Sequence, residues 1–380
     1  MRRSTPNRRV LILQRILPHY RVAFFCELFR RLEERHISLR LLYGQERPGT
    51  VPRTEPLDEP WAVRIRNRYV ALSNREVVWQ PCVAAVMRFD LVIVEQANRL
   101  LLNYPLLAAR RTGRFKLALW GHGGNFRTQR GFLGELVRRV SSRQVDWWFA
   151  YNGLSRDAVL RLGYPDKRIT VVNNTIDTRG FEQAVEAWRS AGRDRLQEKT
   201  GTSSDHVALF CGGMYPDKEL PFLLDACRRI REDVPDFEAV FVGDGPDARL
   251  VREAARRHPW VKYAGHLDGA DRAPYFAVGS AMLMPGNVGL AAVDSLTAGI
   301  PLFTTSGRRH APEIAYIENG KTGRVTDHDP QAYARSVSDY LNDPDARQVF
   351  RRHCRQGAVA LSVEGMASRF SRGVEACLRV

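Results

Sequence analysis

The chain has 380 residues, of which 44% are hydrophobic and 26% charged, and its formal net charge is +16. This length allows two domains with separate cores, and the composition is that of a folded chain without low-complexity tracts. No apolar run approaches the roughly 20 residues that cross a bilayer. Residues 1–9 are basic but lack the apolar core of a signal peptide, and the six cysteines form no Cys-x-x-Cys or Cys/His cluster. We therefore expect a cytoplasmic protein with free thiols.

The excess of positive charge restricts the choice of partners. Such a charge suits nucleic acid, an anionic membrane surface or an anionic substrate. The basic residues are spread along the chain and no nucleic-acid-binding motif is present, so we expect no nucleic-acid partner. Residues 106–116 and 132–143 combine arginines with apolar side chains. This combination is typical of a helix at an anionic bilayer, and it equally fits a solvated basic face over an ordinary core stripe.

The first half alternates short apolar strands with helices. A helix with an apolar face is predicted at 21–34, and strands are predicted at 10–14, 37–43, 91–94, 117–120, 147–151 and 169–172. Their apolar runs do not alternate with polar residues, which indicates a parallel sheet covered on both faces.

A polar stretch at 183–205, predicted to be helical over 183–199, serves as the expected linker between a domain at 1–182 and a second domain at 206–355. Residues 356–380 are expected to form a C-terminal helix that packs back towards the first domain. In the second domain, helices are predicted at 220–231 and 247–257, and strands at 207–211, 239–242, 261–264, 281–284 and 301–304. We predict an α/β fold of two Rossmann-like domains facing each other across a cleft, with ligands beyond the carboxyl ends of the strands.

The most informative segment follows the strand at 281–284. Its apolar run breaks at Pro285-Gly286, and a helix is predicted to begin near 288–291 and to stop at 299–301. A helix N-terminus beyond the carboxyl end of a strand presents unpaired N–H groups and partial positive charge, so it suits a phosphate. Asp294 lies within this helix, where its carboxylate would accept a hydrogen bond from a ribose hydroxyl.

Several such segments follow one another along the chain. They are Asn173-Asn174-Thr175-Ile176-Asp177, Gly212-Gly213-Met214-Tyr215-Pro216-Asp217-Lys218, Val242-Gly243-Asp244-Gly245-Pro246, 285–294 and Gly299-Ile300-Pro301. This succession resembles the retaining nucleotide-sugar glycosyltransferases of the GT-B fold, a large family of bacterial mannosyl-, glucosyl- and N-acetylglucosaminyltransferases. The resemblance implies sugar transfer from a nucleotide diphosphate sugar to a hydroxyl of a saccharide or lipid-linked acceptor, in polysaccharide or glycoconjugate synthesis. It also implies that neither a cofactor nor a metal is needed.

The resemblance assigns donor-binding roles. Lys218 corresponds to the family's diphosphate-binding lysine and is expected to be catalytic, although a surface lysine at a helix start is the alternative. Asp294 falls on the second acidic position of a Glu-x7-Glu segment, which binds ribose in relatives. Gly213 stands where the family usually has arginine, and Gly286 stands at the first acidic position. The complete expected donor set is Gly212, Gly213, Lys218, Gly243, Gly286, Val288, Gly289, Leu290, Ala291 and Asp294.

In the first domain, residues that directly follow strands are expected to take part in catalysis or to bind the acceptor. A family histidine after the strand at 117–120 faces the donor sugar, which gives His122 a catalytic role by bonding a sugar hydroxyl or stabilising charge. The expected acceptor contacts are Arg15, His19, Tyr20, Glu95 and Asn125.

The sequence is compatible with more than one kind of acceptor and with more than one class of function. The basic, apolar first domain favours a polyprenyl-linked acceptor and peripheral binding at the inner face of the plasma membrane; a soluble acceptor is the alternative. A nucleotide-sugar epimerase shares the architecture, but Gly286 removes a carboxylate that it would use. A GT-B protein that binds without catalysis is supported by Gly213 and Gly286, whereas Lys218, Asp294 and His122 argue against it.

Overall fold

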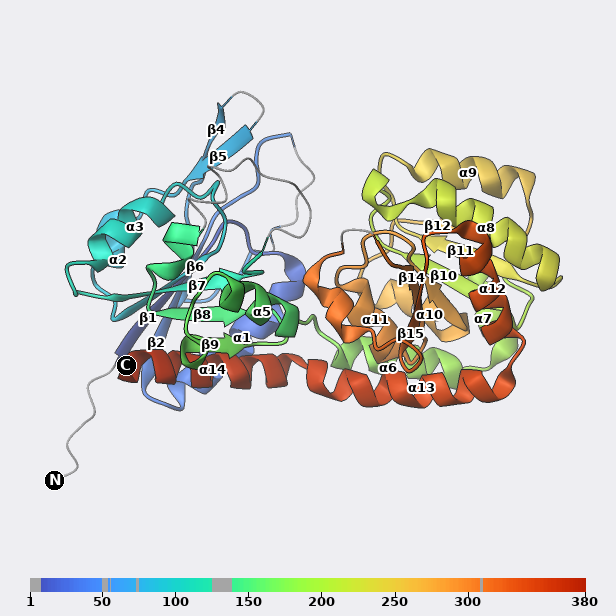
Figure 1. Cartoon of the computed structure of the whole chain (residues 1–380). Helices are drawn as coiled ribbons and strands as arrows, with labels where there is room; N and C mark the ends of the chain where they lie inside the picture. Colours follow the sequence, from blue (N-terminus) through green and yellow to red (C-terminus); the bar gives the residue numbers. More distant parts are fainter. Residues whose placement is uncertain (1–7, 50–53, 55, 73–74, 125–138, 308–309) are drawn as a thin grey trace. The chain divides into compact units, whose positions relative to one another are not determined.

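The computed structural model describes residues 8–49, 54, 56–72, 75–124, 139–307 and 310–380 (Figure 1). The chain forms two compact units. The first consists of Met1–Ile176 with Val363–Val380, and the second of Asp177–Ser362. Each unit contains its own parallel sheet, as predicted, with helices packed against it.

The first unit is built on a parallel sheet of seven strands in the order β3-β2-β1-β6-β7-β8-β9. These strands are β1 (Arg8–Gln14), β2 (Ile37–Tyr43), β3 (Ala62–Arg64), β6 (Leu91–Glu95), β7 (Lys116–Gly121), β8 (Trp147–Ala150) and β9 (Ile169–Val171). Along β1, Val10 and Ile12 join the core on one face, whereas Leu11 and Leu13 join the core on the other. Burial of both faces explains why the apolar runs are continuous.

Helices cover both faces of this sheet. The core on one face is completed by α1 (His19–Glu33) and α14 (Val363–Arg379), and the core on the other by α2 (Val83–Val86), α3 (Asn103–Arg110) and α5 (Gly153–Arg161). A 3-10 turn, η1 (Asp166–Arg168), precedes β9. An antiparallel hairpin of β4 (Arg68–Leu72) and β5 (Arg75–Trp79), which the sequence analysis did not anticipate, completes the unit.

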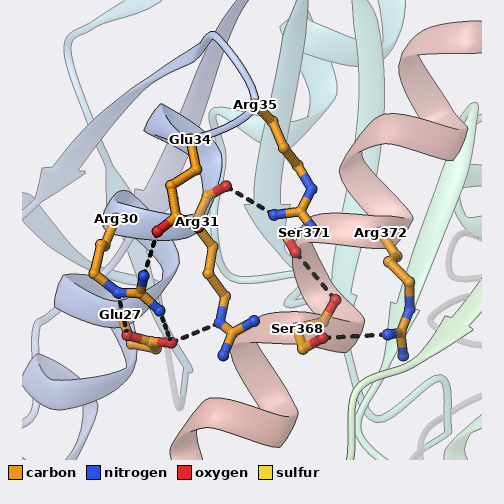
Figure 2. Close-up of polar contacts among 8 residues, drawn as sticks. All are labelled: Glu27, Arg30, Arg31, Glu34, Arg35, Ser368, Ser371 and Arg372. Atoms are coloured by element: carbon orange, nitrogen blue, oxygen red, sulfur yellow. Dashed lines mark hydrogen bonds and ion pairs between the residues drawn. The ribbon is translucent and has the colours of Figure 1, made fainter.

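The C-terminal helix α14 is an integral part of the first unit. Phe370 is fully buried and stacks on Phe149 of β8, with ring centroids 4.1 Å apart. Arg35, just past the end of α1, pairs with Glu375 of α14 through Nε and Oε2 at 3.3 Å. Figure 2 shows polar side chains of these two helices, which bond mainly within their own segment. The last helix therefore contributes to the core of the unit that contains the N-terminal strands.

The second unit contains a parallel sheet of six strands in the order β12-β11-β10-β13-β14-β15. The strands are β10 (Val207–Cys211), β11 (Glu238–Val242), β12 (Val261–Gly265), β13 (Ala281–Leu283), β14 (Leu302–Thr305) and β15 (Gly323–Thr326). The helices are α6 (Arg179–Ser190), α7 (Arg193–Thr200), α8 (Leu220–Asp233), α9 (Ala248–Arg257), α10 (Ala273–Val278), α11 (Ala291–Ala298), α12 (Pro330–Leu341) and α13 (Pro344–Ala358). Short 3-10 turns are η2 (Pro216–Lys218), η3 (Gly269–Arg272), η4 (Pro312–Tyr316) and η5 (Val359–Leu361).

Residues 183–205, the expected linker, fall within the second unit. They form most of α6 and all of α7, which are separated at Gly192, where φ is +93°. Phe181 and Val185 of α6 are buried in the core of this unit. Residues 356–362 also belong to the second unit, and the chain re-enters the first unit at Val363.

Each sheet has one point where the strand order reverses. In the first sheet this point lies between β1 and β6, and in the second it lies between β10 and β13. Loops that leave neighbouring strands in opposite directions open a crevice at the carboxyl ends, and ligands of doubly wound sheets bind there. We therefore expect ligand-binding residues in the loops after these four strands.

Candidate functional site

The loop after β10 is held in place by close backbone contacts. Gly212 has a φ of +153°, and a Cβ on Gly243, which follows β11, would lie only 1.9 Å from the Gly212 carbonyl oxygen. Met214 N donates to Asp244 O at 2.8 Å. Gly243 thus lets two loops approach each other, which is an architectural reason for glycine there.

Asn287 connects three loops at the switch point of the second sheet. Its backbone N donates to Asp217 O at 2.8 Å, and its Nδ2 donates to Asp217 Oδ2 at 2.9 Å. Ala311 N donates to Asn287 Oδ1 at 2.8 Å, and Lys218 Nζ donates to the Asn287 carbonyl oxygen. Asn287 is 2% exposed. This hub was not anticipated, although a polar residue between Gly286 and Val288 in a buried loop is a signal that could have revealed it.

Gly286 occupies a position with no room for a side chain. A Cβ there would lie 2.3 Å from Asp217 O and 2.8 Å from the backbone carbon of Lys218. Backbone atoms cannot move aside as a flexible side chain can, so the loop after β13 must carry glycine to pack against Lys218. The acidic side chain of the related motif is therefore replaced here by a direct contact between two loops.

The loop that leads into α11 offers unpaired N–H groups. Within the described residues, the amides of Val288, Gly289, Leu290 and Ala291 donate to no protein acceptor. Val288 is buried, whereas Gly289, Leu290 and Ala291 are partly exposed. Gly289 has a φ of +59°, which places the following amides at the start of the helix. These donors and the Lys218 ammonium are suited to an anion such as a diphosphate.

The Asp294 carboxylate forms a buried ion pair. Arg272 Nη1 donates to Asp294 Oδ2 at 2.8 Å and Nη2 donates to Oδ1 at 3.3 Å. The guanidinium also lies 5.0 Å from the ring centroid of Phe181. Burial lowers the pKa of Arg272, but the Asp294 carboxylate outweighs burial, so the pKa is raised overall. The sequence analysis missed Arg272 because nothing in the turn after β12 indicates its partner. A ribose bound to Asp294 would share the carboxylate with this arginine.

His310 lies beside the same loops. Its Nε2 donates to Thr305 O at 2.8 Å, and Thr305 Oγ1 donates to Pro285 O at 2.7 Å. Burial lowers the pKa of His310, and the charge of Lys218 acts in the same direction. Both effects disfavour a second positive charge beside the lysine. Residues 308–309 lie outside the described part of the chain.

In the first unit, three of the expected residues lie at the carboxyl ends of β1, β6 and β7. Arg15 N donates to Glu95 Oε1 at 2.6 Å, and Arg15 Nη1 donates to the Tyr69 hydroxyl oxygen at 3.4 Å. The His122 ring packs edge-on against Tyr151, with centroids 4.3 Å apart. The topology thus brings Arg15 and Glu95 together at the switch point of this sheet.

The remaining residues expected to bind the acceptor are His19, Tyr20 and Asn125. His19 is exposed at the start of α1, and its ring lies 5.7 Å from that of Tyr20. Asn125 lies outside the described residues.

Arg21 is a further residue of this edge that sequence reasoning missed. It is only 4% exposed, and its Nη2 donates to Asn174 Oδ1. Its guanidinium carbon lies 4.8 Å from the Trp120 ring centroid, and Nη1 lies 3.8 Å from the sulfur of Met366 in α14. Asn174 comes from the Asn-Asn-Thr-Ile-Asp segment, so this segment anchors a buried arginine.

No cluster of at least three His, Cys, Asp or Glu side chains suited to a metal ion occurs among the residues that the structure describes. Metal independence remains a prediction that requires its own assay.

Comparisons with known proteins place the second unit in a family. Residues 205–343 match the model of the family described as Glycosyl transferases group 1. D-inositol 3-phosphate glycosyltransferase of Streptomyces scabiei is 30% identical over 198 residues, which cover 48% of this chain and 42% of that protein. GDP-mannose-dependent alpha-(1-6)-phosphatidylinositol monomannoside mannosyltransferase of Mycolicibacterium smegmatis is 25% identical over 250 residues, covering 56% of this chain and 64% of that protein. The chain thus spans less than half of the length of the first relative.

The solved structures share the architecture of the whole chain. The structure of HepE of Anabaena in complex with UDP aligns with a TM-score of 0.70 and 15% identity, covering 97% of this chain and 99% of that one. The fold is therefore that of the GT-B glycosyltransferases, with two Rossmann-like units. The second of these units contains a domain of the group 1 glycosyl transferases.

Proposed function

We propose that the protein transfers a sugar from a nucleoside diphosphate sugar, bound by the second unit, to an acceptor hydroxyl bound by the first, with retention of configuration. The observation that carries the proposal is the position of the Lys218 ammonium, bonded to the Asn287 carbonyl oxygen at the switch point of a group 1 domain. The unpaired amides of residues 288–291 follow in the same loop. A cation and several N–H donors form a suitable environment for a diphosphate.

The proposed chemistry requires stabilisation of the leaving group. The bond between the anomeric carbon and the diphosphate oxygen breaks, and negative charge accumulates on the diphosphate. Preorganised donors directed at this charge lower the barrier, and this is the role we give to Lys218 and the amides. The acceptor oxygen forms the new bond to the same carbon, and its proton passes to an oxygen of the leaving diphosphate. We assign His122 a hydrogen bond to the donor sugar and Asp294 a contact to ribose.

The first test measures release of free nucleoside diphosphate from UDP-, GDP-, ADP- and dTDP-sugars in the presence of saccharide acceptors. One donor should react, and Lys218→Met should slow the reaction by about 10²-fold. The exposed Lys199 provides the matched variant, and Lys199→Met should react like the wild type. Addition of EDTA should leave the rate unchanged. Failure of every donor would contradict the proposal, and loss of activity in EDTA would contradict its metal-free mechanism.

The same assay separates transfer from epimerisation. An epimerase would convert the nucleotide sugar into an isomer and release no free diphosphate during the sugar interconversion. Gly286 carries no acidic group and packs against the backbone of Lys218, so this loop supplies no carboxylate for proton abstraction there. Accumulation of an isomerised nucleotide sugar without transfer would therefore overturn our proposal in favour of the epimerase.

We further propose that the acceptor is lipid-linked and that the protein binds the cytoplasmic face of a membrane. The name of the Mycolicibacterium smegmatis relative specifies a phosphatidylinositol lipid, which supports this proposal. Among the described residues, no helix is long and apolar enough to span a bilayer. A groove of about 440 Å³ is lined by side chains that include the exposed Tyr104 and Val140, with Arg111 beside them.

Two basic residues of the segment 106–116 make contacts within the protein and are therefore less available to a membrane surface. Arg110 is engaged in a bidentate pair with Asp146, with Nε–Oδ2 and Nη2–Oδ1 distances of 2.6 and 2.5 Å. Lys116 Nζ donates to Cys377 O at 2.8 Å. These two residues serve internal contacts, which leaves Arg111 and Arg114 exposed in this segment.

Sedimentation with vesicles tests the membrane part of the proposal. The protein should pellet with vesicles that contain anionic lipid at low salt, and high salt should release it. Val140→Asp should weaken pelleting, whereas Val359→Asp, at an 80% exposed position in the second unit, should not. Absence of pelleting at low salt would contradict peripheral membrane binding.

A further inference from the structure

We infer that Arg21 is a positioning residue, which orients the imidazole of His122 by fixing the ring of Tyr151. The inference rests on the proposed function, in which His122 bonds the donor sugar, and it adds a residue that acts one step away from the substrate. It is carried by contacts within the first unit that link the start of α1, the end of β8 and the loop after β7.

The backbone on both sides of His122 is held by close contacts. Gly121 is the last residue of β7, and a Cβ there would lie 2.8 Å from the Cβ of Gln96. Gly123 N donates to Gln96 Oε1 at 3.0 Å. The φ of Gly123 is +69°, and a Cβ on this residue would lie 2.7 Å from Ser155 O. Such contacts restrict the loop backbone, so the remaining freedom of His122 is that of its side-chain torsions.

The ring of Tyr151 restricts these torsions. It lies edge-on to the His122 ring, with centroids 4.3 Å apart and an interplanar angle of 65°. The backbone of Tyr151 is tied to the same strand end, because its N donates to Gly121 O at 3.3 Å. Its carbonyl oxygen accepts from Asn174 N at 2.7 Å. The orientation of the imidazole therefore depends on where the phenol ring is held.

The guanidinium of Arg21 contacts this phenol ring within a cage of aromatic side chains. Its carbon lies 4.8 Å from the ring centroid of Trp120, 5.5 Å from that of Tyr20 and 5.7 Å from that of Tyr151. Its Nη2 donates to Asn174 Oδ1, which fixes the guanidinium in the cage. A cation over the face of an aromatic ring is attracted by the quadrupole of the ring. Arg21 therefore holds the Tyr151 ring in place.

Packing alone does not explain an arginine at position 21. Arg21 is 4% exposed, and the atoms bonded to its guanidinium, Asn174 Oδ1 and the sulfur of Met366, are neutral. Burial of a charge among neutral partners costs free energy. Apolar side chains of similar volume often replace buried charged groups without loss of stability. The fixation of the Tyr151 ring, in contrast, requires the charge and the planar fork of a guanidinium.

Transfer kinetics of the full-length protein, with the nucleotide sugar that proves to be the donor, test the inference. Arg21→Met should lower kcat by about tenfold or more and leave the KM for the donor within about twofold, because a misplaced imidazole affects the transition state more than the bound ground state. Its melting temperature should stay within about 3 °C of the wild type, since packing is retained. The matched control is Arg31→Met, which replaces another arginine of α1, bonded to Glu27, and should leave kcat unchanged (Figure 2).

A mutant cycle distinguishes positioning from a general structural role. When Arg21→Met is added to His122→Ala, kcat should fall by no more than about twofold, because the arginine acts through the imidazole. Tyr151→Leu removes the intervening ring at a half-buried position and should lower kcat as Arg21→Met does, so it carries the test if Arg21→Met does not fold. The inference is overturned if folded Arg21→Met has a normal kcat, or if it lowers kcat equally with and without His122.

A spectroscopic measurement tests the same contact without turnover. Nuclear magnetic resonance of protein with 13C-labelled histidine observes the Cε1–H signals of the imidazole rings, and His122→Ala identifies the signal of His122. The ring current of Tyr151 influences this signal, so it should move in Arg21→Met and stay in place in Arg31→Met. An unchanged signal in Arg21→Met would contradict this inference alone. A shifted signal in a protein that transfers sugar from no donor would contradict the proposed function alone.

Discussion

Asp294 shares its carboxylate with Arg272, so a change at this residue has two effects. Removal of the carboxylate leaves a guanidinium buried against Phe181 and without its counter-ion. A loss of nucleotide binding in a single variant would therefore combine the loss of a ribose contact with a general loss of stability.

A mutant cycle separates the two effects. Asp294→Ala should lower the free energy of unfolding by about 3–5 kcal/mol, because it breaks a buried ion pair. The double variant Arg272→Met/Asp294→Ala should recover most of this loss, since it removes the unpaired charge. Urea denaturation measures both, and UDP binding is then compared between the double variant and Arg272→Met. If Asp294→Ala is as stable as the wild type, the ion pair contributes nothing to the free energy of unfolding.

Glu95 predicts a dependence of stability on pH. Its pKa is raised on folding by burial, so the folded state binds more protons than the unfolded state once the pH passes the ordinary value of 4.5. Stability is therefore lost as the pH rises from that value through the folded-state pKa, and no further loss occurs above it. The Glu95→Gln variant has no carboxyl group to titrate at this position, so it should not show this loss of stability. Its melting temperature should exceed that of the wild type increasingly between about pH 4 and neutral pH.

The control for this experiment is Glu33→Gln, at an exposed position of α1. Its melting temperature should follow the wild type at every pH. A wild type that gains stability over Glu95→Gln as the pH rises would reverse the sign and contradict the account of this residue.

The sequence predicts individual residues of the site only where a local pattern marks them. Lys218 is singled out by the family resemblance, and Asp294 by its place in a helix after a strand end and by the same resemblance. Arg272, Asn287 and Arg21 are not, because each acts through partners that are distant in the sequence, such as Asp294, Asp217 and Asn174. Such pairings follow from the packing of loops and carry no short-range signal.

At the scale of elements, the loop after β13 packs against the loop after β10 without room for a side chain at Gly286. The contact holds the backbone of Lys218, so the position of the lysine depends on a glycine in another element. The same contact leaves no space for an acidic side chain at that position.

Gly286→Ala should therefore destabilise the protein by about 1–3 kcal/mol, because the added Cβ overlaps the backbone of residues 217–218. Gly286→Glu should be at least as destabilising and should not improve nucleotide binding. Gly153→Ala is the control, since a Cβ there has no atom within 4 Å and φ is not positive; its effect should stay within about 0.5 kcal/mol. Thermal and urea denaturation measure all three. Normal stability of Gly286→Ala would contradict the close contact.

Elements with long apolar runs are well predicted by the sequence. The strands at 37–43 and 207–211 have the expected bounds, and both belong to sheets buried on two faces. The β4–β5 hairpin was missed although its strands, Arg-Tyr-Val-Ala-Leu and Arg-Glu-Val-Val-Trp, are mostly apolar. The edge strand β15 was missed because its sequence, Gly-Arg-Val-Thr, contains only one large apolar side chain. The helix predicted at 183–199 is interrupted at Gly192, where a positive φ ends one helix before the next begins.

At the scale of the whole molecule, the chain passes between the units twice, after Ile176 and after Ser362. The last helix therefore completes the core of the first unit. Within that unit, the Phe370 ring lies 5.0 Å from Trp120 and 5.5 Å from Phe24, and it stacks on Phe149.

Phe370→Ala should lower the free energy of unfolding by about 3–5 kcal/mol, because it leaves a cavity in this aromatic cluster. Val359→Ala, at a position that is 80% exposed just before α14, should have little effect. Urea denaturation followed by tryptophan fluorescence measures the difference. A Phe370→Ala variant as stable as the wild type would contradict the integration of α14 into the first unit.

Nucleotide binding by the second unit is the central claim, and a thermal-shift panel of UDP, GDP, ADP and dTDP tests it most directly. A ligand that binds the folded state raises the melting temperature by mass action. One nucleotide should stabilise the wild type and Lys199→Met alike, and the shift should be lost or strongly reduced in Lys218→Met. If no nucleotide shifts the melting temperature, or if Lys218→Met responds like the wild type, the proposed donor site is contradicted.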